Sequence, residues 1–104
     1  MRTVMLEPRV QYPVYAELTV GTTAVGLASS TPALPDGTTR AYIACETGAV
    51  RWRADGTDPT STTGHYIAVN DSVAFTNREY IDLLLAIKFI QVTVEAKLTI
   101  TYDP

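Results

Sequence analysis

Four residues of this 104-residue chain combine a reactive type with a spacing that could support chemistry. Cys45 is the only cysteine and His65 the only histidine, so a thiol–imidazole nucleophile would require the fold to bring these two together. Asp55 and Asp58 are close in sequence and could form an acid/base pair or hold calcium. Their spacing does not follow the pattern of oxygen ligands in an EF-hand loop.

Structural roles account for the same residues more simply. Asp side chains accept hydrogen bonds from backbone N–H groups two residues on, and Gly56 supplies a permissive φ, so the Asp55 segment is typical of a turn. Cys45 lies in an alternating segment as a small core residue, and His65 has no second histidine for a zinc site. Phosphate-loop, nucleophile-elbow and H-E-x-x-H motifs are absent. We therefore expect no catalytic residues, no cofactor and no metal.

Trp52 is the best local candidate for ligand binding. It stands between Arg51 and Arg53, and an exposed Trp in that setting could stack on a sugar or a base. Alternation places Trp52 on the same strand face as Val50, with the arginines on the other. The pattern therefore favours a buried Trp, and a carbohydrate-binding module remains an alternative.

Alternating hydrophobicity predicts the elements that must position these residues. From Pro13, apolar residues fall on one face of a strand and polar residues on the other, and similar segments follow along the chain. Asn70-Asp71 fits a two-residue hairpin turn, and residues 77–85 have helical spacing, with Asn77 as a possible cap. The expected strands are 13–20, 24–28, 40–47, 49–53, 64–69, 72–76, 87–94 and 96–102. We predict an all-β fold, a single small antiparallel β-sandwich or jelly-roll-like domain of about eight strands with one short helical turn. The domain is residues 13–104, preceded by an N-terminal arm, residues 1–12.

Composition supports the all-β interpretation and limits the function. The chain has 16 threonines and 2 lysines, and its sequence pI is near 4.9. β-Branched and aromatic residues suit a pleated surface, which disfavours a helical bundle and disorder. A chain without a basic excess is a poor general nucleic-acid binder. With one cysteine, no signal-peptide pattern and no membrane-length apolar run, we expect folding in a reducing cytoplasm.

Two segments are suited to partner contacts. The arm and the proline-bearing loop at residues 29–39 could both reach a neighbouring protein, since loops on a rigid scaffold commonly carry such roles. Threonine-rich outer strand faces and scarce lysine also suit an interface. The candidate contact residues are Arg2, Val4, Leu6, Arg9, Tyr12, Pro32, Leu34 and Pro35.

The second half of the chain resembles a known group. Residues 50–60 form an aromatic strand and an Asp-Gly-Thr-x-Pro-Thr turn, followed by the Gly-containing strand start at 64–66. Leu83-Leu84-Leu85, Lys88-Phe89-Ile90 and Thr99-Ile100-Thr101-Tyr102 follow in that order. This pattern is similar to that of small β-sandwich virion proteins of tailed bacteriophages. Its matched positions imply structural turn and core roles for Trp52, Asp55, Gly56, Asp58, Pro59, Thr60 and Phe89.

The turn also resembles one in immunoglobulin-like modules attached to bacterial glycosidases, but for a chain of this length we expect neither a catalytic domain nor a signal peptide. The phage resemblance implies a non-enzymatic virion protein that folds in the host cytoplasm and then joins the particle. We expect a capsid decoration (cement) protein that bridges copies of the major capsid protein. It would act in many copies or as a homo-oligomer and contact neither nucleic acid nor membrane. A tail, neck or fibre-attachment component is the alternative placement.

Overall fold

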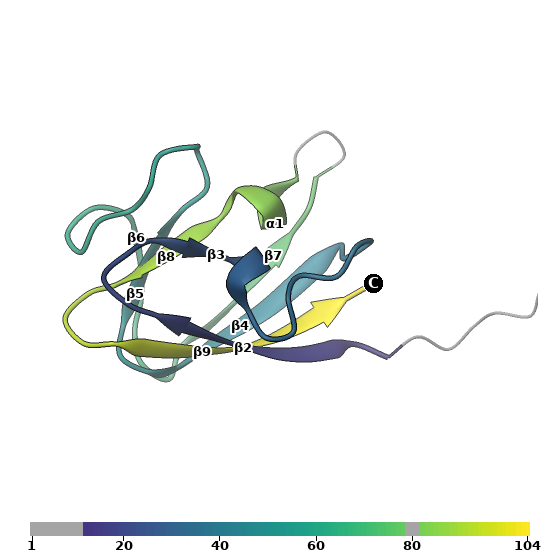
Figure 1. Cartoon of the computed structure of the whole chain (residues 1–104), viewed down its shortest axis with the longest axis horizontal. Helices are drawn as coiled ribbons and strands as arrows, with labels where there is room; N and C mark the ends of the chain where they lie inside the picture. The colour runs from purple at the N-terminus through teal and green to yellow at the C-terminus, as the bar shows by residue number, and fades with distance from the viewer. Residues whose placement is uncertain (1–11, 79–81) are drawn as a thin grey trace, which may run out of the picture.

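The computed structural model describes residues 12–78 and 82–104, in which eight strands form two four-stranded antiparallel sheets. Figure 1 shows these strands and the helical turns between them. The strands are β2 (Val14–Val20), β3 (Val25–Gly26), β4 (Arg40–Thr47), β5 (Val50–Arg53), β6 (His65–Ile67), β7 (Ser72–Thr76), β8 (Lys88–Gln91) and β9 (Ala96–Asp103). The predicted small all-β sandwich is therefore confirmed.

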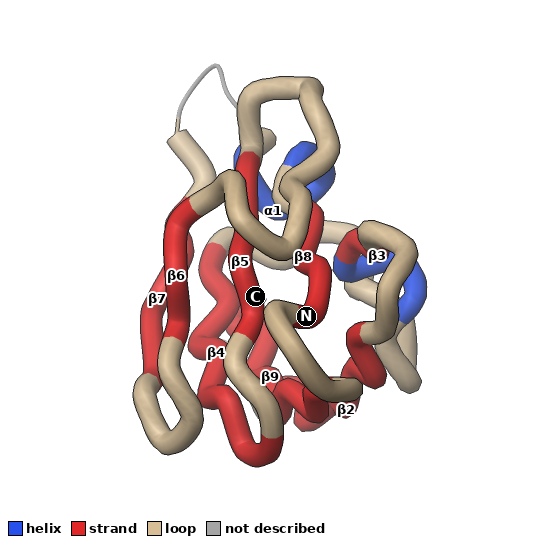
Figure 2. The backbone as a smooth tube through the Cα atoms, turned by 90° about the vertical axis from the view of Figure 1, so that its left-hand side faces the viewer, coloured by secondary structure: helices blue, strands red, loops and turns tan. Residues whose placement is uncertain are grey.

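The strand order is that of a jelly roll. One sheet has the order β2-β9-β4-β7 and the other β3-β8-β5-β6, and Figure 2 shows them as two layers. Early strands pair antiparallel with late ones, β2 with β9, β3 with β8, β4 with β7 and β5 with β6. Such nested pairing arises when a long antiparallel ribbon wraps into two sheets, which is how a jelly roll limits its exposed edges.

The core lies between the two sheets and follows the predicted alternation. In β2 the side chains of Ala16, Leu18 and Val20 are buried, and in β9 alternate residues from Ala96 to Tyr102 are buried. Phe89 on β8 is fully buried, as predicted. Among the residues that the structure describes, no threonine is buried. The threonine excess therefore belongs to the surface and the turns.

The hairpin predicted at Asn70-Asp71 is wrong. Asn70 does adopt a positive φ of 73°. However, β6 and β7 belong to different sheets. The backbone groups of the turn bond to β4: the Asn70 N–H donates to the Cys45 carbonyl and the Cys45 N–H donates to the Asp71 carbonyl. The turn therefore crosses between sheets, because β4 offers it partners that β6 does not.

Two segments differ from the elements that the sequence predicts for them. The expected strand at 24–28 gives way after Gly26 to a 3-10 turn, η1 (Leu27–Ser29). Among the described residues of the helix expected at 77–85, the helical ones belong to α1 (Leu83–Ala86), where the Asp82 side chain accepts from the Leu85 N–H. The N-cap is thus Asp82 and not Asn77 as predicted, although the Asn77 side chain also accepts from the Leu84 N–H at 3.0 Å. Residues 79–81 of the expected helix lie outside the described residues. In the part of the chain that is described, no helix has the length and apolar character needed to cross a membrane.

Candidate functional site

Cys45 and His65 do not form a catalytic pair. Cys45 is buried on β4, where its thiol donates to the Gly48 carbonyl at 2.7 Å. Burial raises the pKa of this thiol, and the nearby Asp71 carboxylate raises it further. His65 is exposed on β6 in the other sheet, and its ring stacks on Trp52 with centroids 4.6 Å apart. The thiol therefore bonds to the backbone and is not paired with the imidazole of His65.

The Asp55 turn is organised by hydrogen bonds and an ion pair. The Arg53 guanidinium donates to both carboxylate oxygens of Asp55, at 3.1 and 2.5 Å. This pairing holds the pKa of Asp55 at about 2, below its usual 3.8. The Thr57 N–H donates to the same carboxylate at 3.3 Å and Gly56 has a φ of +89°, as expected for this turn.

Asp58 is also paired, with the Lys88 ammonium 3.3 Å from its carboxylate. Each of the two aspartates therefore faces a cation of the chain itself, which competes with binding of a metal ion. Among residues 12–78 and 82–104, no three acidic, His or Cys side chains cluster as a metal site would require.

The rest of the loop between β5 and β6 is fixed to the sheet. The Thr60 hydroxyl accepts from the Thr63 N–H at 2.9 Å. Arg51 donates to the Ser61 and Gly64 carbonyls at 3.1 and 2.9 Å. Pro59 is buried against this arrangement. The turn residues quoted in the resemblance therefore hold the loop in place.

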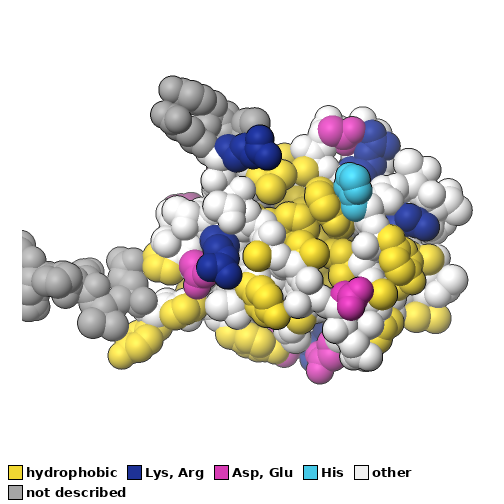
Figure 3. All heavy atoms as spheres, turned by 180° about the vertical axis from the view of Figure 1, so that it is seen from behind, with side chains coloured by type: hydrophobic (Ala, Val, Ile, Leu, Met, Phe, Trp, Pro, Cys, Tyr) yellow, Lys and Arg dark blue, Asp and Glu magenta, His cyan; other side chains and the backbone are white. Residues whose placement is uncertain are grey.

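Trp52 is half-buried on the inner face of its sheet. Its ring meets the edge of Phe75 at a centroid distance of 4.9 Å and lies against His65. Figure 3 shows the histidine at the surface beside a group of hydrophobic side chains. Trp52 therefore packs against two aromatic neighbours, and they cover part of the ring surface that a sugar would use.

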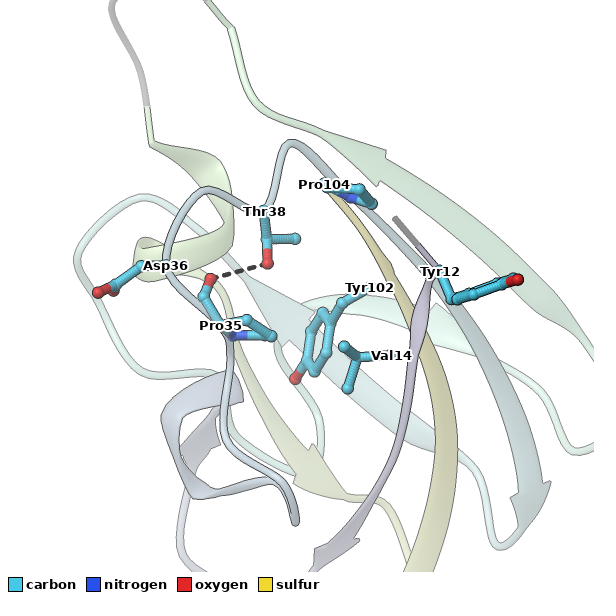
Figure 4. Close-up of a pocket in the computed structure, with 7 residues that line it drawn as sticks. All are labelled: Tyr12, Val14, Pro35, Asp36, Thr38, Tyr102 and Pro104. Carbon is cyan, nitrogen blue, oxygen red and sulfur yellow. Dashed lines mark hydrogen bonds between the residues drawn. The ribbon is translucent and has the colours of Figure 1, made fainter. Parts of the chain in front are cut away.

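A hollow of about 310 Å³ opens where the N-terminal arm meets the domain. Val14 from β2, Tyr102 from β9 and Pro35 from the loop before β4 point toward one another there, whereas the Tyr12 ring points outward (Figure 4). Tyr12 is 80% exposed and Tyr102 is buried beneath the surface. The full lining is Tyr12, Val14, Pro35, Asp36, Thr38, Tyr102 and Pro104. We call this site the arm-root hollow.

One wall of the arm-root hollow is anchored through Tyr102 and Ser30. The hydroxyls of these two buried residues lie 2.6 Å apart. The Ser30 hydroxyl also lies 2.8 Å from the carbonyls of Leu27 and Pro32. Burial raises the pKa of Tyr102, while the hydrogen bond with Ser30 acts in the opposite direction. The start of the loop is thus attached to the last strand inside the core.

The other end of the loop is attached to the C-terminal segment. The Thr38 hydroxyl donates to the Pro35 carbonyl at 2.7 Å and closes a turn in which Gly37 has a φ of +82°. The Thr39 N–H then donates to the Asp103 carbonyl at 2.9 Å. Figure 1 shows the C-terminus beside this loop. Because hydrogen bonds hold both ends of the loop, its surface is already ordered.

Two predicted contact residues, Tyr12 and Pro35, meet at the arm-root hollow. Pro32 is exposed on the same loop. Leu34 is half-buried, packs against the core and donates its N–H to the Leu27 carbonyl, so it also supports the loop. The remaining candidates, Arg2, Val4, Leu6 and Arg9, lie outside the described residues.

Sequence reasoning missed Val14, Asp36, Thr38, Tyr102 and Pro104 as lining residues of the hollow. The Pro-Asp-Gly-Thr stretch at 35–38 signals a turn. That Val14 and Tyr102 lie beside this turn could not be predicted, because it depends on the pairing of β2 with β9, which sets these two residues opposite each other.

The chemistry of the arm-root hollow suits a protein segment. Proline, valine and tyrosine form most of its wall, with the Asp36 carboxylate at an exposed position. Its volume is at the lower end for small-molecule sites, which span roughly 300–1,000 Å³. An apolar side chain or a proline ring has a size and chemistry that this hollow could accept.

No protein-family model, curated protein or solved structure matches this chain. The resemblance to phage virion proteins is therefore a hypothesis.

Proposed function

We propose that this protein is a non-enzymatic structural subunit of a tailed-phage virion, and that it decorates the capsid by bridging capsid subunits. The observation that carries the proposal is the arm-root hollow, where the base of the arm and the loop before β4 meet. These are the two segments that the sequence marks for contact. Their convergence gives a partner one continuous surface.

The anchoring of the loop supports this proposal. Because Tyr102, Ser30 and Thr39 hold the loop at both ends, a partner would bind a surface that is already ordered. Preorganised contacts lose less conformational entropy on binding. Jelly rolls also occur among viral capsid domains, although they serve lectins too, so the fold alone assigns no function.

The proposed mechanism is mechanical. A subunit seated across a junction between capsid proteins adds buried area that must be broken before the shell can open. Binding only to the assembled shell then stabilises it by mass action.

The test is binding to purified shells that lack the protein. Wild type should bind and co-sediment with them. Tyr12→Ala removes an 80% exposed ring at the arm-root hollow. We expect this variant to bind about tenfold or more weakly, as is common for a central interface aromatic. Tyr66→Ala, at a 55% exposed tyrosine on the other sheet, is the matched control and should bind like wild type.

Copy number then separates the placements within a virion. Mass spectrometry of purified particles should give hundreds of copies for a decoration protein. A small number set by ring symmetry would assign the protein to the tail or neck instead. Absence from particles, together with failure to bind shells, would refute the proposal.

A further inference from the structure

The outward side of the β2-β9-β4-β7 sheet is a second surface, separate from the arm-root hollow. None of its side chains is fully buried. We call it the tyrosine face, after Tyr15 and Tyr42, which are 57% and 44% exposed. Its residues are Tyr15, Glu17 and Thr19 on β2, Lys97, Thr99, Thr101 and Asp103 on β9, Arg40, Tyr42, Ala44 and Glu46 on β4, and Ser72, Ala74 and Thr76 on β7.

The two tyrosines lie in one row across this face. Both stand opposite Thr101, one from β2 and the other from β4. The Tyr15 hydroxyl donates to the Glu17 carboxylate at 3.0 Å, so its ring leans along the strand. The Tyr42 hydroxyl donates to the Ser72 hydroxyl at 2.9 Å, so its ring leans toward β7.

Charges at the two ends of the face alternate between the central strands. At one end Arg40 on β4 lies 3.7 Å from Asp103 on β9. At the other end the signs are exchanged: Lys97 on β9 lies 3.8 Å from Glu46 on β4 and 3.4 Å from Glu17 on the outer strand β2. Each strand therefore carries opposite charges at its ends. Such an arrangement is complementary to itself when the two strands exchange places.

A two-fold axis parallel to the strands, between β4 and β9, performs that exchange. A second copy laid face to face would place its Asp103 over Arg40, and its Glu46 over Lys97. The same rotation exchanges β2 with β7 and matches side chains by size. By register, Tyr15 would meet Ala74 of the second copy, and Tyr42 would meet its Thr101.

We propose that the tyrosine face is a two-fold interface that binds a second copy of this chain. Four strands about 4.8 Å apart and five to eight residues long give roughly 450 Å² of area on each copy. This is less than the ~800 Å² per partner of a standard interface, so the dimer should be weak and concentration-dependent. The proposal uses none of the hollow residues and stands independently of the proposed function.

A two-fold axis perpendicular to the strands is the competing arrangement. It would place Arg40 over Glu46 of the second copy, and Asp103 over its Lys97. The size match is poorer, because Ala74 would then face Ser72 and leave a gap. Sheets that pack face to face with aligned strands cross at about 30°, which moves the ends of facing strands apart. The long Arg and Lys side chains at the ends of the face can span this separation.

A charge exchange between two chains tests the proposal. Arg40→Glu and Asp103→Arg each place like charges together in a homodimer. In an equimolar mixture, the carboxylate introduced at position 40 of one chain would face the guanidinium introduced at position 103 of the other. The unchanged Asp103 of the first chain would likewise face the unchanged Arg40 of the second. Sedimentation velocity should therefore show wild type as a monomer–dimer mixture, each variant as a monomer, and the mixture of variants as a dimer.

The design excludes an effect confined to one chain. Within each variant the pair at positions 40 and 103 is repulsive whether or not the two are mixed, so only contact between chains can restore association. Circular dichroism checks that both variants, altered at partly exposed positions, stay folded. Raising the salt concentration should weaken the wild-type dimer.

Three outcomes would overturn the proposal. Wild type could remain monomeric at its highest soluble concentration. The single variants could dimerise like wild type. The mixture could stay monomeric, which would exclude the strand-parallel axis. A monomer that binds shells and loses binding on Tyr42→Ala would assign the face to a different protein.

Discussion

The hydroxyl oxygens of Tyr102 and Ser30 lie 2.6 Å apart inside the core, although 72 residues separate the two positions in sequence. Ser30 starts the loop before β4, and Tyr102 lies near the end of β9. This contact therefore couples the loop that lines the arm-root hollow to the central strand of a sheet.

Tyr102→Phe removes this link while keeping the ring. Ser30 retains the carbonyls of Leu27 and Pro32 as partners for its proton. We expect the free energy of unfolding to fall by about 1 kcal/mol, the usual value of one hydrogen bond. Urea denaturation measures it, and Tyr12→Phe, at an 80% exposed ring, should change nothing measurable. A Ser30→Ala double-mutant cycle with no coupling would show that the contact contributes nothing.

Alkaline pH should weaken the fold through the same residue. Burial raises the pKa of Tyr102 above its ordinary 10.0. The unfolded chain therefore loses this proton first, and the contribution to stability is lost as pH rises above 10. Melting temperature should fall more steeply over this range for wild type than for Tyr102→Phe. Parallel curves for the two proteins would contradict the prediction.

Gly48→Ala should be strongly destabilising. Gly48 has a φ of +71°, and an added Cβ would lie 2.8 Å from the Glu95 carbonyl oxygen. Gly37→Ala is the matched control, because its φ is +82° but nothing lies within 4 Å of the added carbon. The control should lose about 1–2 kcal/mol from backbone strain alone. Gly48→Ala should lose clearly more in the same urea experiment, and equal losses would mean that the backbone relaxes around the methyl group.

Asp55 should titrate at unusually low pH. Its pKa is held at about 2 by the Arg53 guanidinium, so its pairing stabilises the fold above the ordinary pKa of 3.8 and is lost as pH falls toward 2. Carboxyl NMR titration measures this value directly. Arg53→Gln should return it toward 3.8. A low pKa that persists in the variant would assign the effect to the turn backbone, including the Thr57 N–H.

Cys45 should resist thiol reagents in the native protein. The side chain is 1% exposed, and burial raises the pKa of the thiol, which disfavours the reactive thiolate. Labelling should proceed in denaturant and be slower in buffer by orders of magnitude. Fast labelling of the folded protein would show that this part of β4 opens readily.

The fold could be predicted from the sequence to the extent that it depends on local alternation. The alternating pattern predicts which side chains face the core. In Val14–Val20 and in residues 98–102, every second side chain is turned inward. Local alternation does not predict which distant strands pair with each other. Asn70 bends the chain as its residue type predicts, but its N–H donates to the carbonyl of Cys45, a residue far from it in sequence. Nothing in the local sequence indicates that choice of partner.

The candidate site was likewise predictable only where it depends on local sequence. Tyr12 and Pro35 could be proposed as contacts because an arm and a proline-bearing loop are recognisable in sequence. Tyr102, which forms the wall between them, looked like any core tyrosine on a strand. Its role depends on where β9 ends relative to the loop, and that position is set by tertiary pairing with β2 and β4.

The position of β9 has a consequence for how this chain is synthesised. β9 lies between β2 and β4, so two earlier strands pair with the strand that is translated after them. While a ribosome is still adding β9, the sheet lacks one of its central strands and β2 has unpaired backbone groups. The jelly roll can therefore close only after residue 103 has emerged, and until then the nascent chain carries strand edges of the kind that chaperones protect.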